Sequence, residues 1–212
     1  MTQNRIVKNY CDHALVTHFM GILRDRNTRK TEFSTALNQL SLLLATLASQ
    51  NLTSVSLSID TPVASTTAHR IVDFPILIPI LRAGLGLLSG FQTLLPESPI
   101  GHIGVERDEK TLSPRFYYYK TPPLRGRHVW LIDPMLATGG SIEFALEKIL
   151  LEKPQSISAI TVMASPEGLA RLHDRYPTLV IHTASIEERL NEHGYIVPGL
   201  GDAGDRYFGT LV

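Results

Sequence analysis

The 212-residue sequence lacks the features that mark secreted, membrane-spanning and nucleic-acid-binding proteins. Cys11 is its single cysteine, so an intrachain disulfide is excluded and a reducing cytoplasm is the setting we expect. Residues 1–10 are polar, without the apolar segment of a signal peptide, and the longest apolar runs, 42–47 and 76–81, are too short to cross a bilayer. Twenty basic and twenty acidic residues cancel, which disfavours a nucleic acid partner but not a small phosphorylated substrate.

Two familiar nucleotide-binding signatures are missing from the most informative segment, residues 131–141. Its sequence, Leu-Ile-Asp-Pro-Met-Leu-Ala-Thr-Gly-Gly-Ser, does not match G-x-x-x-x-G-K-[ST], and the chain has no Gly-Lys pair, so the phosphate loop of a kinase or ATPase is disfavoured. The segment does not match the dinucleotide-binding pattern G-x-G-x-x-G either. Nor does any pair of histidines in the chain have convincing metal-ligand spacing.

What the segment does contain is the pattern of a strand, a small-residue loop and a helix. Residues 128–132 predict a buried strand, and apolar side chains recur at helical spacing from Ile142 to Leu150. The first N–H groups of a helix lack partners within it and attract anions, so the two glycines and the hydroxyls of Thr138 and Ser141 predict a phosphate-binding loop. The alternative is an ordinary strand–helix turn in which Ser141 caps the helix.

Asp133 separates these two interpretations. A carboxylate beside a phosphate would be repelled unless it faced another part of the same ligand, such as two ribose hydroxyls or a hydrated Mg²⁺. The phosphate loop and the carboxylate together therefore predict a sugar-phosphate ligand.

Hydrophobic patterning predicts a single α/β domain over residues 1–212, with a parallel sheet flanked by helices. Strands and helices are expected to alternate along the second half of the chain, at 128–132, 142–151, 157–164, 167–176 and 179–183. In the first half we expect strands at 54–62 and 70–81, and helices at 83–95 and 31–49, the latter capped by Thr31. Residues 103–107 and 116–120 flank a polar turn and predict a β-hairpin.

Ligands of open parallel sheets bind at the carboxyl ends of the strands. Arg82, Asp133, Pro166 and Ile186 each follow or end a predicted strand. We therefore expect these four residues to lie at one crevice.

Three long segments, in this order, resemble motifs of the uracil phosphoribosyltransferase family, a branch of the type I phosphoribosyltransferases. Asp-Pro-Met-Leu-Ala-Thr-Gly-Gly-Ser at 133–141 is similar to that family's ribose-5-phosphate loop, and Pro-Ile-Leu-Arg-Ala-Gly-Leu-Gly at 79–86 to its pyrophosphate loop. The tail from Asn191, which includes Tyr-Ile-Val-Pro-Gly-Leu-Gly-Asp-Ala-Gly at 195–204, resembles its uracil-binding C-terminus. The resemblance implies a parallel sheet with a β-hairpin arm and a C-terminal base-binding loop.

The reaction implied by the resemblance is displacement of pyrophosphate from 5-phospho-α-D-ribose 1-diphosphate (PRPP) by N1 of uracil, which gives UMP in pyrimidine salvage. Mg²⁺ is the implied cofactor, and the implied assembly is a homodimer or a larger homo-oligomer, with GTP activation left open. Asp133, Arg107 and Asp202 are implied to be catalytic, and Asp202 is also implied to reach Mg²⁺ through water. The residues implied to bind PRPP are Arg82, Ala83, Gly84, Arg107, Asp133, Pro134, Met135, Leu136, Ala137, Thr138, Gly139, Gly140, Ser141 and Asp202. Uracil is implied to be read by Ile196, Gly201, Asp202 and Ala203.

Several alternatives stay open. Arg82 could form a surface ion pair, Arg107 could belong to a solvated charged turn, and Asp202 could bond only its own backbone. The chain also carries Glu106 where the family usually has Tyr. A phosphoribosyltransferase for another base, or a regulator that binds UMP or RNA without turnover, would share much of the sequence pattern.

Overall fold

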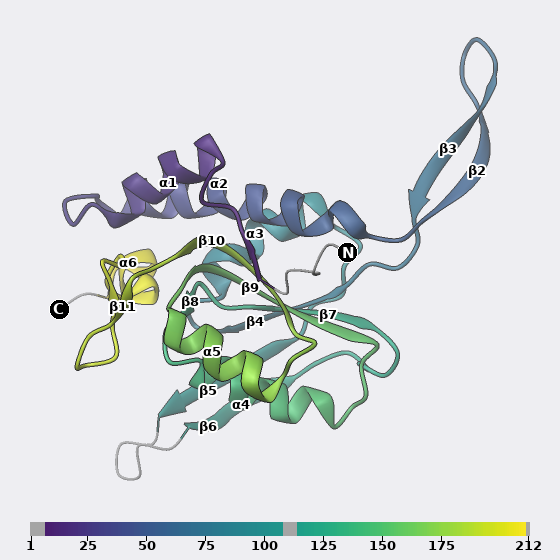
Figure 1. The fold of residues 1–212 in the computed structure, drawn as a ribbon. Coiled ribbons are helices and arrows are strands. Elements are labelled where there is room, and N and C mark those ends of the chain that lie inside the picture. Colours follow the sequence, from purple (N-terminus) through teal and green to yellow (C-terminus); the bar gives the residue numbers. More distant parts are fainter. Residues whose placement is uncertain (1–6, 108–113, 211–212) are drawn as a thin grey trace, which may run out of the picture.

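An eight-stranded, mostly parallel sheet forms the centre of the protein (Figure 1). The computed structural model describes residues 7–107 and 114–210. The main strand order is β1-β10-β9-β7-β4-β5-β6, and β8 pairs with β9. The strands are β1 (Val7–Asn9), β4 (Ile76–Leu81), β5 (His102–Arg107), β6 (Pro114–Lys120), β7 (His128–Ile132), β8 (Met135–Leu136), β9 (Ser156–Ala164) and β10 (Val180–Ile186). All pairs are parallel except β5–β6, so the predicted parallel sheet is confirmed.

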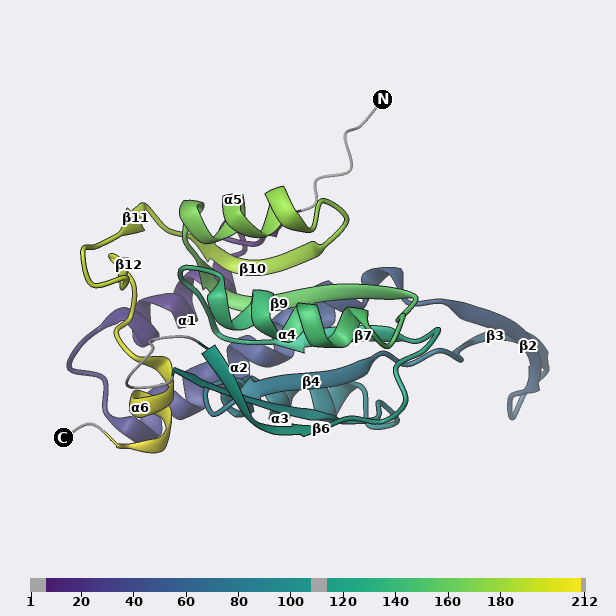
Figure 2. The same ribbon diagram turned by 90° about the horizontal axis from the view of Figure 1, so that it is seen from below.

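Helices cover both faces of this sheet (Figures 1 and 2). On one face lie α1 (Ala14–Arg24), α2 (Lys30–Ala48) and α3 (Leu85–Leu94); on the other lie α4 (Gly140–Leu150) and α5 (Pro166–Arg175). Two buried apolar clusters result, and successive residues of β7 alternate between them: Trp130 and Ile132 join one, Val129 and Leu131 the other. Because both faces of β7 are buried, its residues 129–132 form a continuous apolar run.

The N-terminal half departs from the sequence expectation in its strands. The expected strand at 70–81 is two strands, because β3 (Ser65–Ile71) ends before Pro75 and β4 begins after it. Proline has no N–H for a ladder and restricts the residue before it, which is a physical reason for the break. β2 (Ser54–Asp60) pairs with β3 in a separate antiparallel hairpin that projects from the body (Figure 1).

Two helix details also differ. Helix α1 was not expected, although Val16, Met20 and Leu23 form its buried stripe. The predicted helix at 31–49 is present as α2, but its cap is Arg29 rather than Thr31, and the Glu32 side chain accepts a bond from the Arg29 N–H. A short 3-10 turn, η1 (Ser49–Asn51), follows α2.

The C-terminal segment is more regular than the ordered loop that the sequence predicted. It contains a two-stranded ladder of β11 (Arg189–Leu190) and β12 (Ile196–Val197), and then helix α6 (Ala203–Phe208). Ser34 of α2 donates a hydrogen bond to the Tyr207 carbonyl, which ties α6 to the helical layer. Over the described ranges, 7–107 and 114–210, no helix has the length and apolar character needed to cross a membrane.

Candidate active site

The first part of the loop after β7, residues 133–136, is bonded to the neighbouring strand β9. The Asp133 N–H donates to Ile160 O at 3.0 Å, and the Pro134 carbonyl accepts from the N–H groups of Val162 and Met163 at 3.0 and 3.1 Å. Met135 and Leu136 then form β8 against the end of β9. The backbone of this loop is therefore fixed before any ligand arrives.

The end of the loop is held by the N-terminus of α5. The Ser165 hydroxyl donates to Ala137 O at 2.6 Å and accepts from Gly168 N at 2.8 Å. Ser165 therefore caps α5 and also connects the loop to the start of this helix. A Cβ on Gly168 would lie 2.2 Å from Ala137 O, which only glycine avoids. Ser165 and Gly168 belong to a segment that the sequence placed beside the site but gave no role.

Helix α4 begins at Gly140 with an open N-terminus. Gly139 occupies the capping position with φ of +79° and no side-chain cap, and Thr138 Oγ1 lies 3.5 Å from the Gly140 nitrogen. The first-turn N–H groups border a cavity of about 390 Å³. The cavity is lined by Asp133, Met135, residues 137–142 and residues 192–194. The structure thus brings the predicted phosphate loop and the start of the C-terminal tail together around one space.

Asp133 is the buried acidic residue in the lining of this cavity. Its residue is 8% exposed, and burial raises the pKa of its carboxyl to about 7, against the lowering effect of the Met135 N–H at 3.3 Å. The charge of Asp202 raises this pKa further. A carboxylate in this position has a strong need for hydrogen-bond donors, which two sugar hydroxyls would supply.

The loop after β4 approaches the end of β7 at Gly84. The Gly84 N–H donates to Ile80 O at 2.9 Å, so it is engaged within the chain, and a Cβ on Gly84 would lie 2.5 Å from Ile132 O. Ala83 packs against the C-terminal segment, because a Cβ on Gly204 would lie 3.6 Å from Ala83 Cβ. Three segments distant in sequence therefore converge: the loop after β4, the end of β7 and the C-terminal tail, of which the strand ends predicted the first two.

Arg82 extends from the β4 loop towards α6. Its Nη2 atom lies 3.1 Å from Asp205 Oδ1, and its guanidinium lies 5.7 Å from the centre of the Phe208 ring. The side chain is 56% exposed. The ion-pair alternative for Arg82 is thus present, and its partner Asp205 belongs to α6, in the C-terminal tail.

Arg107 is the last residue of β5, and its side chain lies outside the described part of the chain, so its role stays a prediction. The hairpin that carries it is confirmed, since β5 and β6 pair antiparallel with a bulge between Gly104 and Val105. Glu106, the departure from the family pattern, lies 2.8 Å from Arg115 on β6. The negative charge of Glu106 is therefore paired across the hairpin.

Asp202 and the residues expected to read the base surround the tight turn before α6. Asp202 Oδ1 accepts from the Asp205 N–H at 2.8 Å, so the carboxylate caps α6. Gly201 has φ of +81°, and Ile196 and Ala203 are buried, at 6% and 3% exposure. Among the described residues, no cluster of three or more His, Cys, Asp or Glu could hold a metal ion by itself.

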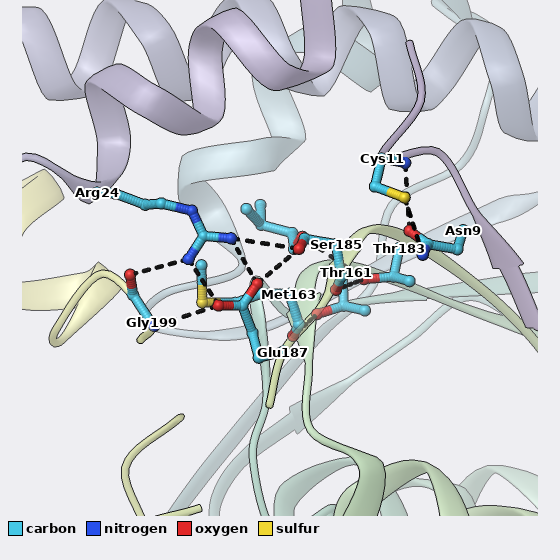
Figure 3. A network of polar contacts seen from close by, with 10 residues as sticks. Asn9, Cys11, Arg24, Thr161, Met163, Thr183, Ser185, Glu187 and Gly199 are labelled. Carbon is cyan, nitrogen blue, oxygen red and sulfur yellow. Dashed lines mark hydrogen bonds and ion pairs between the residues drawn. The ribbon is translucent and has the colours of Figure 1, made fainter. Parts of the chain in front are cut away.

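The sequence did not single out a polar network that borders this turn (Figure 3). Arg24 at the end of α1 pairs with Glu187, just beyond β10, and both contact Gly199. One signal was available: an acidic residue directly after a buried strand, as Glu187 is, requires a partner. Its partner lies 163 residues away, which no local pattern identifies.

Comparison with known proteins gives a consistent result. The family described as uracil phosphoribosyltransferase matches residues 10–210. The proteins named uracil phosphoribosyltransferase from Lactiplantibacillus plantarum and Symbiobacterium thermophilum are 41% and 43% identical to the chain over 201 residues, which is 94% of this chain and 96% of each relative.

Solved structures agree with these sequence matches. A protein from Aquifex aeolicus superposes with a TM-score of 0.91 at 33% identity, over 97% of this chain and 99% of its own. A hypoxanthine-guanine phosphoribosyltransferase from Bacillus anthracis, at 10% identity, has a TM-score of 0.51 over 73% of this chain and 79% of its own. The second similarity concerns the fold alone.

Proposed function

This chain belongs to the uracil phosphoribosyltransferase family, and on that premise we propose how its residues transfer the 5-phosphoribosyl group of PRPP to N1 of uracil. The products are UMP and pyrophosphate. The observation that supports the proposal best is the cavity of about 390 Å³ in which the 133–141 loop faces residues 192–194. The predicted phosphate site, the carboxylate predicted to bind the sugar and the first residues of the C-terminal tail border the same space.

The 133–141 loop holds the ribose 5-phosphate. The N–H groups at the start of α4 and the hydroxyls of Thr138 and Ser141 are donors matched to phosphate oxygens. Asp133 accepts from the two ribose hydroxyls, which restores to its buried carboxylate the hydrogen bonds lost on leaving water. Residues 134–137 contribute a rigid backbone, since they are bonded to β9 and to Ser165.

The pyrophosphate lies at the loop of Arg82, Ala83 and Gly84 and receives Arg107 from the β5–β6 hairpin. Positive charge develops on the ribose and negative charge on pyrophosphate as the bond between them breaks, so donors fixed around the leaving group lower the barrier. Arg82 has the freedom to turn from Asp205 to pyrophosphate, because its side chain is half exposed and its ion pair is at the surface.

Mg²⁺ accompanies PRPP in this proposal. When bound, it would neutralise charge on the pyrophosphate oxygens, and the Asp202 carboxylate would hold it through water. The acidic side chains fit a metal carried by the substrate, because Mg²⁺ commonly binds through one or two carboxylates together with substrate phosphates. Asp202 supplies such a carboxylate. The bond from the Asp205 N–H to its Oδ1 fixes the position of the side chain, and its charge acts on the pKa of Asp133, so it lies close to the predicted ribose site.

Uracil is read by the backbone of Ile196, Gly201, Asp202 and Ala203. Its O4 and O2 are acceptors and its N3–H is a donor, and rigid main-chain groups can match that order with little adjustment. A turn with glycines at positive φ lets the backbone approach the base without an intervening Cβ.

The assembly proposed is a homodimer or a larger homo-oligomer in the cytoplasm. Support for association comes from the projecting β2–β3 hairpin, on which Val55, Ile59 and Val63 are exposed at 45%, 39% and 94%. Support for a reducing compartment comes from Cys11, an exposed free thiol. Light scattering of the purified protein measures the assembly directly.

The test of the function is product analysis with the purified protein. UMP and pyrophosphate should form in equal amounts when PRPP, Mg²⁺ and uracil are all present, and neither should form when PRPP or uracil is omitted. Absence of UMP in the complete mixture, with a folded protein, contradicts the proposal.

A further inference from the structure

Glu187 is a buried carboxylate with a complete set of partners. Its side chain is 1% exposed, and Arg24 binds it with both terminal nitrogens, Nη1 to Oε2 at 2.6 Å and Nη2 to Oε1 at 2.5 Å. The Ser185 hydroxyl also donates to Oε1, at 2.6 Å, and accepts from Arg24 Nη2 at 3.2 Å. Burial acts to raise the pKa of Glu187, but these donors hold it below its ordinary value, so the carboxylate is charged.

The same ion pair holds both polar groups of the Gly199 backbone (Figure 3). The Gly199 N–H donates to Glu187 Oε2 at 3.2 Å, and Gly199 O accepts from Arg24 Nη1, also at 3.2 Å. Gly199 has φ of +66°, and a Cβ there would lie 2.2 Å from Ile196 O. The pair therefore fixes a tight turn whose two sides, Ile196 and Gly201, are expected to face uracil.

A second arginine fixes the far side of this turn. Arg206 of α6 donates to Leu200 O at 2.8 Å and to the carbonyl of Leu23, beside Arg24. Its guanidinium lies 4.4 Å from the centre of the Phe33 ring. The C-terminal end of α1 thus contacts both ends of residues 199–206: Arg24 binds Gly199, and the Leu23 carbonyl accepts from Arg206.

The energetics favour a role in geometry over a role in stability. Removing two charges from water costs free energy that their attraction only roughly recovers, so a buried ion pair is a poor way to stabilise a fold. A bidentate pair does impose a defined position on whatever it binds. Here the bound group is the backbone of the expected base-reading turn.

We propose that Arg24 and Glu187 form a positioning pair that sets the register of the uracil-reading backbone and so determines base affinity and base discrimination. The inference rests on the proposed function. Neither side chain is assigned a contact with substrate; each acts through Gly199. Loss of the pair should shift the main-chain donors and acceptors by a fraction of an ångström, which is enough to weaken a fixed hydrogen-bonding pattern.

The test compares Glu187→Gln and Arg24→Lys with the control Arg127→Lys. Arg127 also pairs with a carboxylate, Asp73 at 3.8 Å, and donates to a main-chain oxygen, Phe74 O at 3.1 Å. It lies just before the first residue of β7, at the amino-terminal end of this strand, whereas the site lies beyond the carboxyl end. Steady-state kinetics with uracil and cytosine, and the thermal shift produced by PRPP alone, are measured for each protein.

For Glu187→Gln we expect the KM for uracil to rise by about tenfold or more, and the preference for uracil over cytosine to fall by a similar factor. The KM for PRPP and the PRPP thermal shift should stay close to those of the parent protein. Arg24→Lys, which keeps the charge but not the bidentate fork, should show the same pattern more weakly. Arg127→Lys should change none of these quantities.

Equal losses in uracil and PRPP binding, or unchanged base selectivity in both variants, would overturn the inference. Failure of both variants to fold would overturn it as well, because the pair would then be a requirement of the fold. Failure of the proposed function looks different: the parent protein itself would show no uracil turnover.

Discussion

Gly84 and Ile132 lie so close that a Cβ on Gly84 would be 2.5 Å from the Ile132 carbonyl oxygen. Gly84 lies in the loop after β4 and Ile132 is the last residue of β7, and the two meet because these strands pair in parallel with Pro79 opposite Ile132. This approach joins the loop expected to bind pyrophosphate to the loop expected to bind the ribose phosphate.

Gly84→Ala should therefore damage both stability and use of PRPP. The methyl group would meet backbone atoms of Ile132 and Ile80, which cannot rotate away, so we expect a loss of about 1–3 kcal/mol in the free energy of unfolding and a higher KM for PRPP. Denaturant unfolding and steady-state kinetics measure the two effects. The control is Gly21→Ala in α1, where a Cβ meets nothing within 4 Å and a gain of about 0.5–1 kcal/mol is expected. A Gly84→Ala protein as stable and active as the parent would contradict the close approach.

Asp133→Asn should stabilise the unliganded protein in a pH-dependent way. Because the pKa of Asp133 is raised from 3.8 to about 7, folding favours its protonated form, and that contribution to stability is complete below pH 3.8 and lost as the pH rises to about 7. At about 1.4 kcal/mol for each pH unit between the two pKa values, the loss amounts to roughly 4 kcal/mol. Asn carries no charge, so the variant's advantage in melting temperature should grow from pH 4 to pH 7 and then level off. An advantage independent of pH would show that Asp133 does not titrate in this range.

Asp133→Asn should also lose most of its turnover, since a neutral amide replaces the carboxylate proposed to accept hydrogen bonds from the ribose hydroxyls. We expect a fall of about 10²-fold or more in kcat/KM for PRPP, typical of losing a preorganised polar contact at a reacting centre. Activity equal to that of the parent protein would remove Asp133 from the ribose site.

Arg82→Ala and Arg107→Ala should each weaken PRPP use by about 10- to 100-fold, the value of a hydrogen bond to a charged group. Initial rates at varied PRPP measure this effect, and dissociation of UMP should change less because UMP lacks the pyrophosphate. Arg125→Ala is the matched control, because Arg125 is exposed and precedes the amino-terminal end of β7, at the other end of this strand from the site. If Arg107→Ala behaves like Arg125→Ala, the hairpin arginine has no part in binding pyrophosphate.

The sequence was sufficient for the elements whose patterns are local. The apolar run of β7, the small-residue loop and the helical spacing from Ile142 are contiguous, and each was located to within two residues. The same holds for β9, α5 and the start of the β5–β6 hairpin.

The remaining features depend on contacts between distant segments. The strand predicted at 54–62 is present as β2, but β3 and its pairing with β2 were missed, because most residues of β3 are exposed and no apolar alternation marks it. The contact of Arg82 with Asp205 and that of Arg24 with Glu187 join residues 123 and 163 positions apart. Such pairs follow from the order of strands in the sheet, which sequence patterning leaves open.

The most direct test of the central claim is the ratio of kcat/KM values for uracil and cytosine, with hypoxanthine and 5-fluorouracil in the same panel. Cytosine reverses the donor and acceptor at two positions of the pairing edge, and each buried mismatch costs roughly 1–3 kcal/mol, so uracil should be preferred by about 10²–10⁴. 5-Fluorouracil keeps the pairing edge and should be accepted, and hypoxanthine should not react. Comparable turnover of cytosine, or turnover of hypoxanthine with none of uracil, would contradict the account.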